Sequence, residues 1–267
     1  MENVKGGDSI KVLFEKLVKS NEVNYWLFII LIVLVEVFFT FLSISIGAII
    51  YLAILMSLLI AALLKYQKPC YQLFSALAII PLIRIISVSL PMTGLSELLK
   101  IVFVSLPLFI TGIIIAKITS ITPKILGFTT YKLHIQLLIS LIGLPLGLIK
   151  FYIIKPKLIN ISVAPVEILM WVITLIFCVG LLEEFLFRGI LFNVAGKFLS
   201  NNKAMYFISL LYAALTISSK SFFNVIYAFM ISLLFCRIFI WKKSIIGISL
   251  AHGIINITFY LICPQIF

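Results

Sequence analysis

The chain has 267 residues, of which 63% are hydrophobic and 11% charged, with a formal net charge of +12. Soluble globular proteins have an apolar share near half and about a quarter charged residues, so this composition excludes a soluble enzyme or binding module. It predicts an integral membrane protein in a lipid bilayer. The lysines cluster in short loops between apolar segments, which is the usual signal of membrane topology, so we expect no nucleic-acid partner.

Residues 1–23 differ from the rest of the chain because lysines surround an apolar stripe at helical spacing. This pattern predicts an amphipathic segment that lies on the cytoplasmic surface of the membrane, not a cleavable signal peptide. The stripe consists of Ile10, Leu13, Phe14, Leu17 and Val18.

The apolar segments that follow are long and lack the alternation of β-strands. They run for about 17 to 22 residues, enough for a helix to cross a hydrocarbon core of about 30 Å. We therefore expect an all-α fold, a polytopic transmembrane helical bundle of about eight or nine helices. Residues 24–267 are expected to form a single transmembrane domain.

The first four expected spans contain one acid and one arginine at membrane depth. Glu36 lies in the first span and Arg84 in the third, and charges in such places need partners because their burial in lipid is costly. For Glu36, a hydrogen-bonded structural carboxylate and a role in the site are equally open. Arg84 could pair with Glu36 or with an acid of a catalytic site, and a structural pair is the favoured alternative. These spans cover residues 25–42, 46–64, 71–90 and 98–118.

Five further spans are expected after the polar stretch 120–132. Most lysines and arginines fall on one side of the membrane if the N-terminus is cytoplasmic, which predicts that orientation. The richness in Ile, Lys, Phe and Asn is typical of an AT-rich prokaryotic genome, so we expect a prokaryotic cell membrane. The spans cover residues 133–154, a segment that begins at Pro165, and residues 204–218, 222–240 and 245–262.

Two adjacent carboxylates, Glu183 and Glu184, stand out in the sixth span. A carboxylate at bilayer depth costs about 2–4 kcal/mol, so its default interpretation is functional. On a helix, Glu184 and Arg188 are four residues apart and can pair, whereas Glu183 is turned about 100° away. One glutamate is therefore expected to be anchored and the other to remain free for chemistry.

His252 and Asn256 form a second polar pair, four residues apart on one face of the last span. At 1.5 Å per residue, His252 lies roughly 10 Å from the cytoplasmic start of that span, a depth that the glutamate helix also reaches. A lone histidine is more often structural, but its asparagine neighbour and the Glu183–Glu184 pair favour a site. We expect both pairs to share one membrane-embedded cavity.

This set of side chains suits peptide hydrolysis without a metal. A glutamate can take a proton from water while imidazole and amide groups stabilise the oxyanion. The pattern His-Glu-x-x-His is absent and the chain has two histidines, so a three-ligand zinc site is hard to assemble. We expect no metal and no cofactor, and we interpret the cysteines as buried apolar residues: Cys70, Cys178, Cys236 and Cys263.

The motifs resemble those of the CAAX-processing and bacteriocin-processing (CPBP or Abi) family of intramembrane glutamic endopeptidases, the type II CAAX prenyl proteases. The family's first motif, Glu-Glu-x-x-x-Arg, is matched by Glu183, Glu184 and Arg188. Its third motif, His-x-x-x-Asn, is matched by His252 and Asn256. The resemblance covers residues 165–257 and marks them as a family-like catalytic core.

The resemblance implies a role for each matched residue. Glu183 would activate water, Glu184 and Arg188 would hold the site, and His252 and Asn256 would bind the oxyanion. The substrate would be a membrane-associated peptide or protein that is cleaved near the membrane surface.

The second motif of the family, Phe-x-x-x-His, is degenerate here, with Tyr212 and Thr216 at its two positions. A hydroxyl cannot accept a proton near neutral pH as imidazole can, and loss of one proton-transfer group costs about 10²–10⁴ in rate. The alternative is therefore a catalytically impaired member that binds a peptide or a partner membrane protein, as in bacteriocin immunity or envelope regulation. A transporter is disfavoured because the chain shows no internal repeat.

Overall fold

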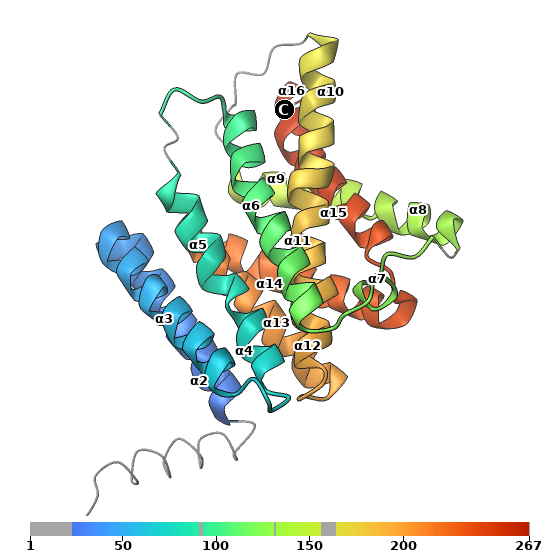
Figure 1. Ribbon diagram of the computed structural model, residues 1–267. Helices are drawn as coiled ribbons and strands as arrows, with labels where there is room; N and C mark the ends of the chain where they lie inside the picture. Colours follow the sequence, from blue (N-terminus) through green and yellow to red (C-terminus); the bar gives the residue numbers. More distant parts are fainter. Residues whose placement is uncertain (1–22, 91–92, 131, 156–163, 267) are drawn as a thin grey trace, which may run out of the picture.

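The computed structural model describes residues 23–90, 93–130, 132–155 and 164–266. Every regular element in these residues is helical, and eight helices are long and apolar enough to cross a membrane (Figure 1). The predicted all-α polytopic bundle is confirmed. The predicted amphipathic segment, residues 1–23, lies outside the described residues except for its last residue.

The N-terminal helices form one flank of the bundle (Figure 1). α2 (Val23–Val37) continues into a π-helical turn, η1 (Phe38–Leu42), and α3 (Ile44–Leu64) begins after Ser43, whose side chain caps the helix by accepting from the Ile46 amide. α3 packs on the next two helices, and α2 packs on α13. Those next helices are α4 (Tyr71–Leu77) and α5 (Ile79–Ser89).

The middle of the chain contributes one long helix, α6 (Glu97–Ile118), and three shorter ones. The short helix α7 (Pro123–Leu126) ends at Gly127, whose φ of 90° is one that a residue with a side chain rarely adopts. α8 (Leu133–Leu141) and α9 (Gly143–Ile154) follow and pack on α15.

The predicted sixth span is a continuous helical run from Pro165 to Ala195. It starts as α10 (Pro165–Thr174), with proline in the first turn, where its missing amide hydrogen costs nothing. The run then alternates between π-helical and α-helical turns. These are η2 (Leu175–Leu181), α11 (Leu182–Glu184), η3 (Phe185–Phe192) and α12 (Asn193–Ala195).

The predicted span at residues 204–218 is not among the eight spans of the described chain. It corresponds to α13 (Asn201–Leu215), whose 15 residues give a length of about 22 Å, short of a core of about 30 Å. Many of its side chains are buried by neighbouring helices. It is therefore an internal helix, and the short turn η4 (Thr216–Ser219) ends it.

The last two spans close the bundle around the site. α14 (Phe222–Lys242) packs on α13, and α15 (Ile246–Ile257) packs on η2, α8 and α9. α15 approaches η2 closely because glycines face each other there: a Cβ on Gly180 would lie 2.5 Å from the Ser249 carbonyl oxygen and 2.8 Å from the Gly253 amide nitrogen. The chain ends in η5 (Thr258–Ile262) and α16 (Cys263–Ile266).

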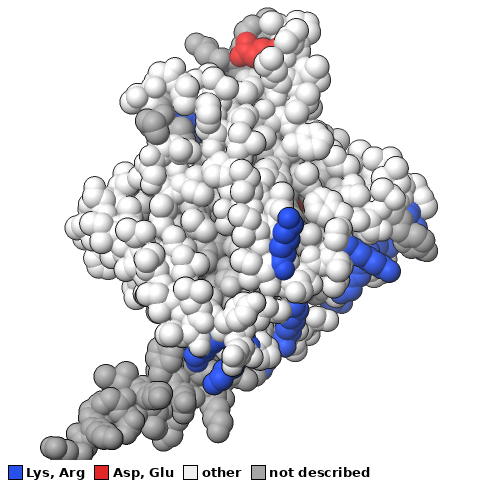
Figure 2. All heavy atoms as spheres, viewed as in Figure 1, with Lys and Arg blue, Asp and Glu red and all other residues white. Residues whose placement is uncertain are grey.

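Charged side chains are distributed unevenly over the visible face of the molecule (Figure 2). Lysine and arginine run from the end where α2 begins along the flank near α7 and α8, whereas this face is otherwise largely uncharged. The connectivity of the helices brings to this basic end Lys65, Lys68, Lys117, Lys124, Lys197, Lys203, Lys242 and Lys243.

Candidate active site

The glutamate pair lies on one short α-helical turn, α11, between the π-helical segments η2 and η3. A π-helical turn inserts extra residues into the helix and changes which side chains face the bundle, and such turns are frequent at functional sites. Here the eight residues of η3 are all buried. Glu184 is also buried, whereas the Glu183 side chain keeps 34% of its surface exposed.

Glu184 holds two other predicted site residues. Its Oε1 accepts from Arg188 Nη1 at 3.2 Å, so the predicted pair forms, and it lies 2.9 Å from His252 Nδ1. Because a carboxylate only accepts, the imidazole presents its Nδ1 hydrogen to Glu184. The Nε2 atom of His252 is then directed toward Glu183 Oε2, at 3.7 Å.

Arg188 is buried and joins the glutamate helix to α14. Its Nη2 donates to the hydroxyl of Ser232 at 2.8 Å and to the Ser232 carbonyl at 3.2 Å. The guanidinium also lies over the rings of Tyr212 and Phe235, at 5.4 and 5.7 Å from their centroids. These contacts fix the cation and, through it, the position of Glu184.

The two residues of the degenerate second motif have different neighbours. The Tyr212 hydroxyl donates to Glu183 Oε2 at 2.9 Å, so this residue touches the exposed glutamate directly. The Thr216 hydroxyl donates to the Ala213 carbonyl at 2.7 Å, within its own helix end. Thr216 thus lines the site, but its hydroxyl hydrogen is directed to the backbone.

Asn256 is buried and takes part in a contact that the sequence analysis missed. The Nζ of Lys150, on α9, donates to Asn256 Oδ1 at 2.7 Å. Lys150 lies within the predicted span 133–154, and the motifs gave it no role. The signal that could have identified it is its position inside an apolar segment, where a lysine needs a partner.

Two cavities meet at Glu183. One, of about 430 Å³, is lined by His252, Asn256 and Lys150, and the other, of about 410 Å³, is lined mostly by apolar side chains of α5, α6 and the helical run that carries Glu183. Glu183 and Thr216 line both. The exposed carboxylate therefore faces a polar space on one side and an apolar space on the other.

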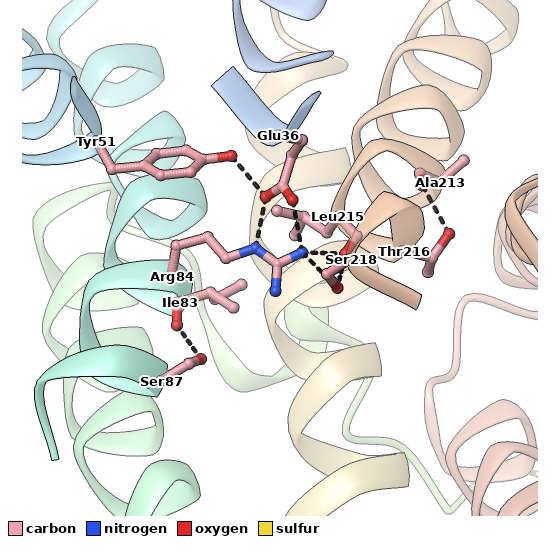
Figure 3. A network of polar contacts seen from close by, with 9 residues as sticks. All are labelled: Glu36, Tyr51, Ile83, Arg84, Ser87, Ala213, Leu215, Thr216 and Ser218. Carbon is pink, nitrogen blue, oxygen red and sulfur yellow. Dashed lines mark hydrogen bonds and ion pairs between the residues drawn. The ribbon is translucent and has the colours of Figure 1, made fainter. Parts of the chain in front are cut away.

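The open question about Glu36 and Arg84 is settled by the geometry (Figure 3). Arg84 Nε and Nη2 bind the two carboxylate oxygens of Glu36 at 2.5 and 2.9 Å, and the Tyr51 hydroxyl donates to the same carboxylate at 2.6 Å. Arg84 Nη2 also donates to the Leu215 carbonyl and to Ser218 Oγ. The favoured structural pair is confirmed, and it holds the end of α13.

Among the described residues, no group of three or more His, Cys, Asp or Glu side chains is placed to hold a metal ion. The cysteines are free; Cys236 and Cys263 are buried as expected, whereas Cys70 and Cys178 are partly exposed, so the expectation is wrong for these two. The expectation of a site without metal or cofactor stays a prediction.

A comparison with protein families matches part of the chain. Residues 165–258 match the family model described as type II CAAX prenyl endopeptidase Rce1-like. No curated protein and no solved structure matches the chain. The matched segment contains all the site residues predicted from the motifs, whereas Glu36, Arg84 and Lys150 lie outside it. The predicted resemblance is thereby confirmed: residues 165–258 are similar to the Rce1-like type II CAAX prenyl endopeptidases.

Proposed function

We propose that this protein is a membrane endopeptidase that hydrolyses a peptide bond with a water molecule activated by Glu183. The observation that carries the proposal is the contrast within the glutamate pair. Glu184 is buried and bound by Arg188 and His252, whereas Glu183 is exposed to two cavities and is held by a hydrogen bond from Tyr212.

In the proposed reaction, the Glu183 carboxylate accepts a proton from water as the oxygen attacks the peptide carbonyl carbon. The carbonyl oxygen becomes an oxyanion, which accepts hydrogen bonds from His252 Nε2–H and the Asn256 amide. The C–N bond then breaks, and Glu183 returns the proton to the leaving nitrogen. In this scheme His252 donates to Glu184 from Nδ1 and to the oxyanion from Nε2.

The proposed substrate is a membrane-associated peptide or protein in an extended conformation. A peptide carbonyl inside a helix is already hydrogen-bonded, so an extended segment presents its bonds better to water and to the oxyanion donors. The apolar cavity of about 410 Å³ beside Glu183 suits apolar substrate side chains. The basic end of the bundle (Figure 2) supports a cytoplasmic N-terminus by the positive-inside rule, in a prokaryotic cell membrane.

A second candidate function is favoured by Thr216. Its hydroxyl donates to the Ala213 carbonyl, and a hydroxyl is no proton acceptor near neutral pH. The same cavities would then bind a peptide or a partner membrane protein without cleaving it, as in bacteriocin immunity or envelope regulation.

Peptide cleavage by the purified protein in detergent separates the two functions. We expect slow cleavage by the wild type, loss of about 10²–10⁴-fold in rate for Glu183→Ala, and faster cleavage by Thr216→His, which supplies an imidazole to the cavity. Glu167→Ala, on the same helical run, is the control and should match the wild type. Silence of both the wild type and Thr216→His on substrates of related proteases would favour the binding function, and an active Glu183→Ala would refute the assigned base.

A further inference from the structure

We propose that Lys150 is a positioning residue that orients the Asn256 amide toward the reacting carbonyl. This inference rests on the proposed function, and it concerns a residue outside the segment that matches the family. The observation behind it is the contact of 2.7 Å between Lys150 Nζ and Asn256 Oδ1.

The ammonium group determines which way the asparagine faces. A lysine ammonium carries only donors, so the atom of Asn256 that contacts it must be the acceptor Oδ1. The Nδ2 group, with its two hydrogens, is then on the other branch of the amide. Asn256 is 3% exposed and lines the polar cavity together with Glu183 and His252. Without the cation, the Asn256 amide is free to rotate by about 180° and place Oδ1 beside the oxyanion. The two oxygens would then repel each other.

Lys150 is itself held in place by aromatic rings. Its Nζ lies 4.7 Å from the centroid of the Phe259 ring and 6.0 Å from that of Tyr260, both on η5. Cation–π contacts of this kind stabilise a lysine that is withdrawn from water. Together with Asn256 they account for a charge that would otherwise be costly within an apolar span. The arrangement therefore connects α9 to one face of the helical run formed by α15 and η5.

The position of the cation adds an electrostatic effect. Lys150 lines the same cavity as Glu183, and its positive charge is close to the group that would donate to the oxyanion. A fixed cation stabilises negative charge that develops in the transition state more than it stabilises a neutral substrate. The effect should therefore appear in kcat and leave KM nearly unchanged.

The cleavage test uses purified full-length protein in detergent. We expect Lys150→Met to lower kcat by about 10- to 100-fold, below the 10²–10³ that loss of a whole oxyanion donor costs, with KM changed by less than about twofold. Lys150→Arg keeps a donor and should recover part of kcat. In the Asn256→Ala background, Lys150→Met should have little further effect, because it acts through the missing amide. Lys155→Met, at the end of the same helix, should behave like the wild type.

A stability measurement tests the pairing without any substrate. Asn256→Asp keeps an oxygen facing Lys150 and should form an ion pair, so its Tm should stay close to that of the wild type. In the Lys150→Met background the same aspartate is buried without a cation, and Tm should fall by several degrees. Equal shifts in both backgrounds, or independent effects of Lys150→Met and Asn256→Ala on kcat, would overturn the inference. If the wild type cleaves nothing, the proposed function fails, and the Tm comparison alone still decides whether Lys150 holds residue 256.

Discussion

Two carboxylate–arginine pairs within the described residues differ in how completely their atoms are bonded. In the Glu36 network, made of Glu36, Tyr51, Arg84, Leu215 and Ser218, both carboxylate oxygens accept from Arg84 (Figure 3). In the Glu184 network, made of Glu184, Arg188, Ser232 and His252, Glu184 Oε2 and Arg188 Nε have no hydrogen-bond partner among the described residues. Both glutamates are fully buried.

This difference in hydrogen bonding indicates that the Glu36 network is structural and that the Glu184 network belongs to the candidate site. A buried ion pair with all its hydrogen bonds made keeps helices together, and the Glu36 network does so for α2, α3, α5 and the end of α13. Unsatisfied buried polar atoms cost free energy and call for an explanation, of which a catalytic role is one. His252 brings the Glu184 network to the wall of the polar cavity beside Glu183, whereas Arg84 and Leu215 of the Glu36 network line only the apolar cavity.

The largest expected effect is on the stability of the Glu36 network. Glu36→Leu leaves the Arg84 cation in the bundle without its counter-ion and should lower the free energy of unfolding by about 3–5 kcal/mol. Denaturation of purified protein in detergent measures it. Cleavage per folded molecule should change little, because Glu36 lines neither cavity at Glu183.

The control for this prediction removes both charges. Glu36→Leu combined with Arg84→Met replaces the ion pair by apolar groups, which is often close to neutral, so most of the stability should return. A double variant as unstable as Glu36→Leu alone would show that the lost packing of Glu36, not the unpaired cation, caused the effect.

A smaller effect is expected where η2 meets α15. Gly180→Ala places a Cβ 2.5 Å from the Ser249 carbonyl oxygen, and this overpacking should cost about 1–3 kcal/mol and separate Glu184 from His252. The cleavage rate should fall by a larger factor than the equilibrium constant for folding does. Gly189→Ala is the matched control on the same helical run, because its Cβ would meet nothing closer than 3.3 Å among the described residues. Equal losses of cleavage in both variants would contradict this account.

Tyr51 and Tyr212 each donate a hydrogen bond to a glutamate, Tyr51 to Glu36 and Tyr212 to Glu183, so the same substitution can be compared at both. Tyr51→Phe removes a hydrogen bond to buried Glu36 and should cost about 1.5 kcal/mol of stability, the low end for charged acceptors, since Arg84 still binds the same oxygen. Tyr212→Phe should cost less stability because water can reach Glu183, but it should slow cleavage by about tenfold, or 1.4 kcal/mol. Thermal unfolding and cleavage rates of the two variants check this, and the reverse pattern would remove the distinction between the networks.

The smallest effect is expected at Thr216. Its hydroxyl hydrogen is directed to the Ala213 carbonyl, so Thr216→Val, which keeps the shape, should change the cleavage rate by less than about twofold. A loss of tenfold or more, measured on the same peptide, would mean that the hydroxyl binds the attacking water.

Hydropathy and helical spacing predicted much of this arrangement. The first span, residues 25–42, and the Glu184–Arg188 contact follow from apolar length and from the spacing of four residues. Hydropathy could not distinguish α13, which is surrounded by protein, from a helix that crosses lipid. The partner of Arg84 is 48 residues away and Lys150 is 106 residues from Asn256, and such distant contacts depend on packing that one sequence does not encode locally.

The bonds from Arg84 to Leu215 and Ser218 have a consequence for dissecting the protein. They start in a helix outside the family-like segment and end inside it, and α8 and α9, also outside, cover α15. A fragment trimmed to residues 165–258 would expose the apolar face of α15 and leave the Leu215 carbonyl without its donor. We therefore expect the recognisable third of the chain to be unable to fold when excised, and the helices around it to be indispensable scaffolding.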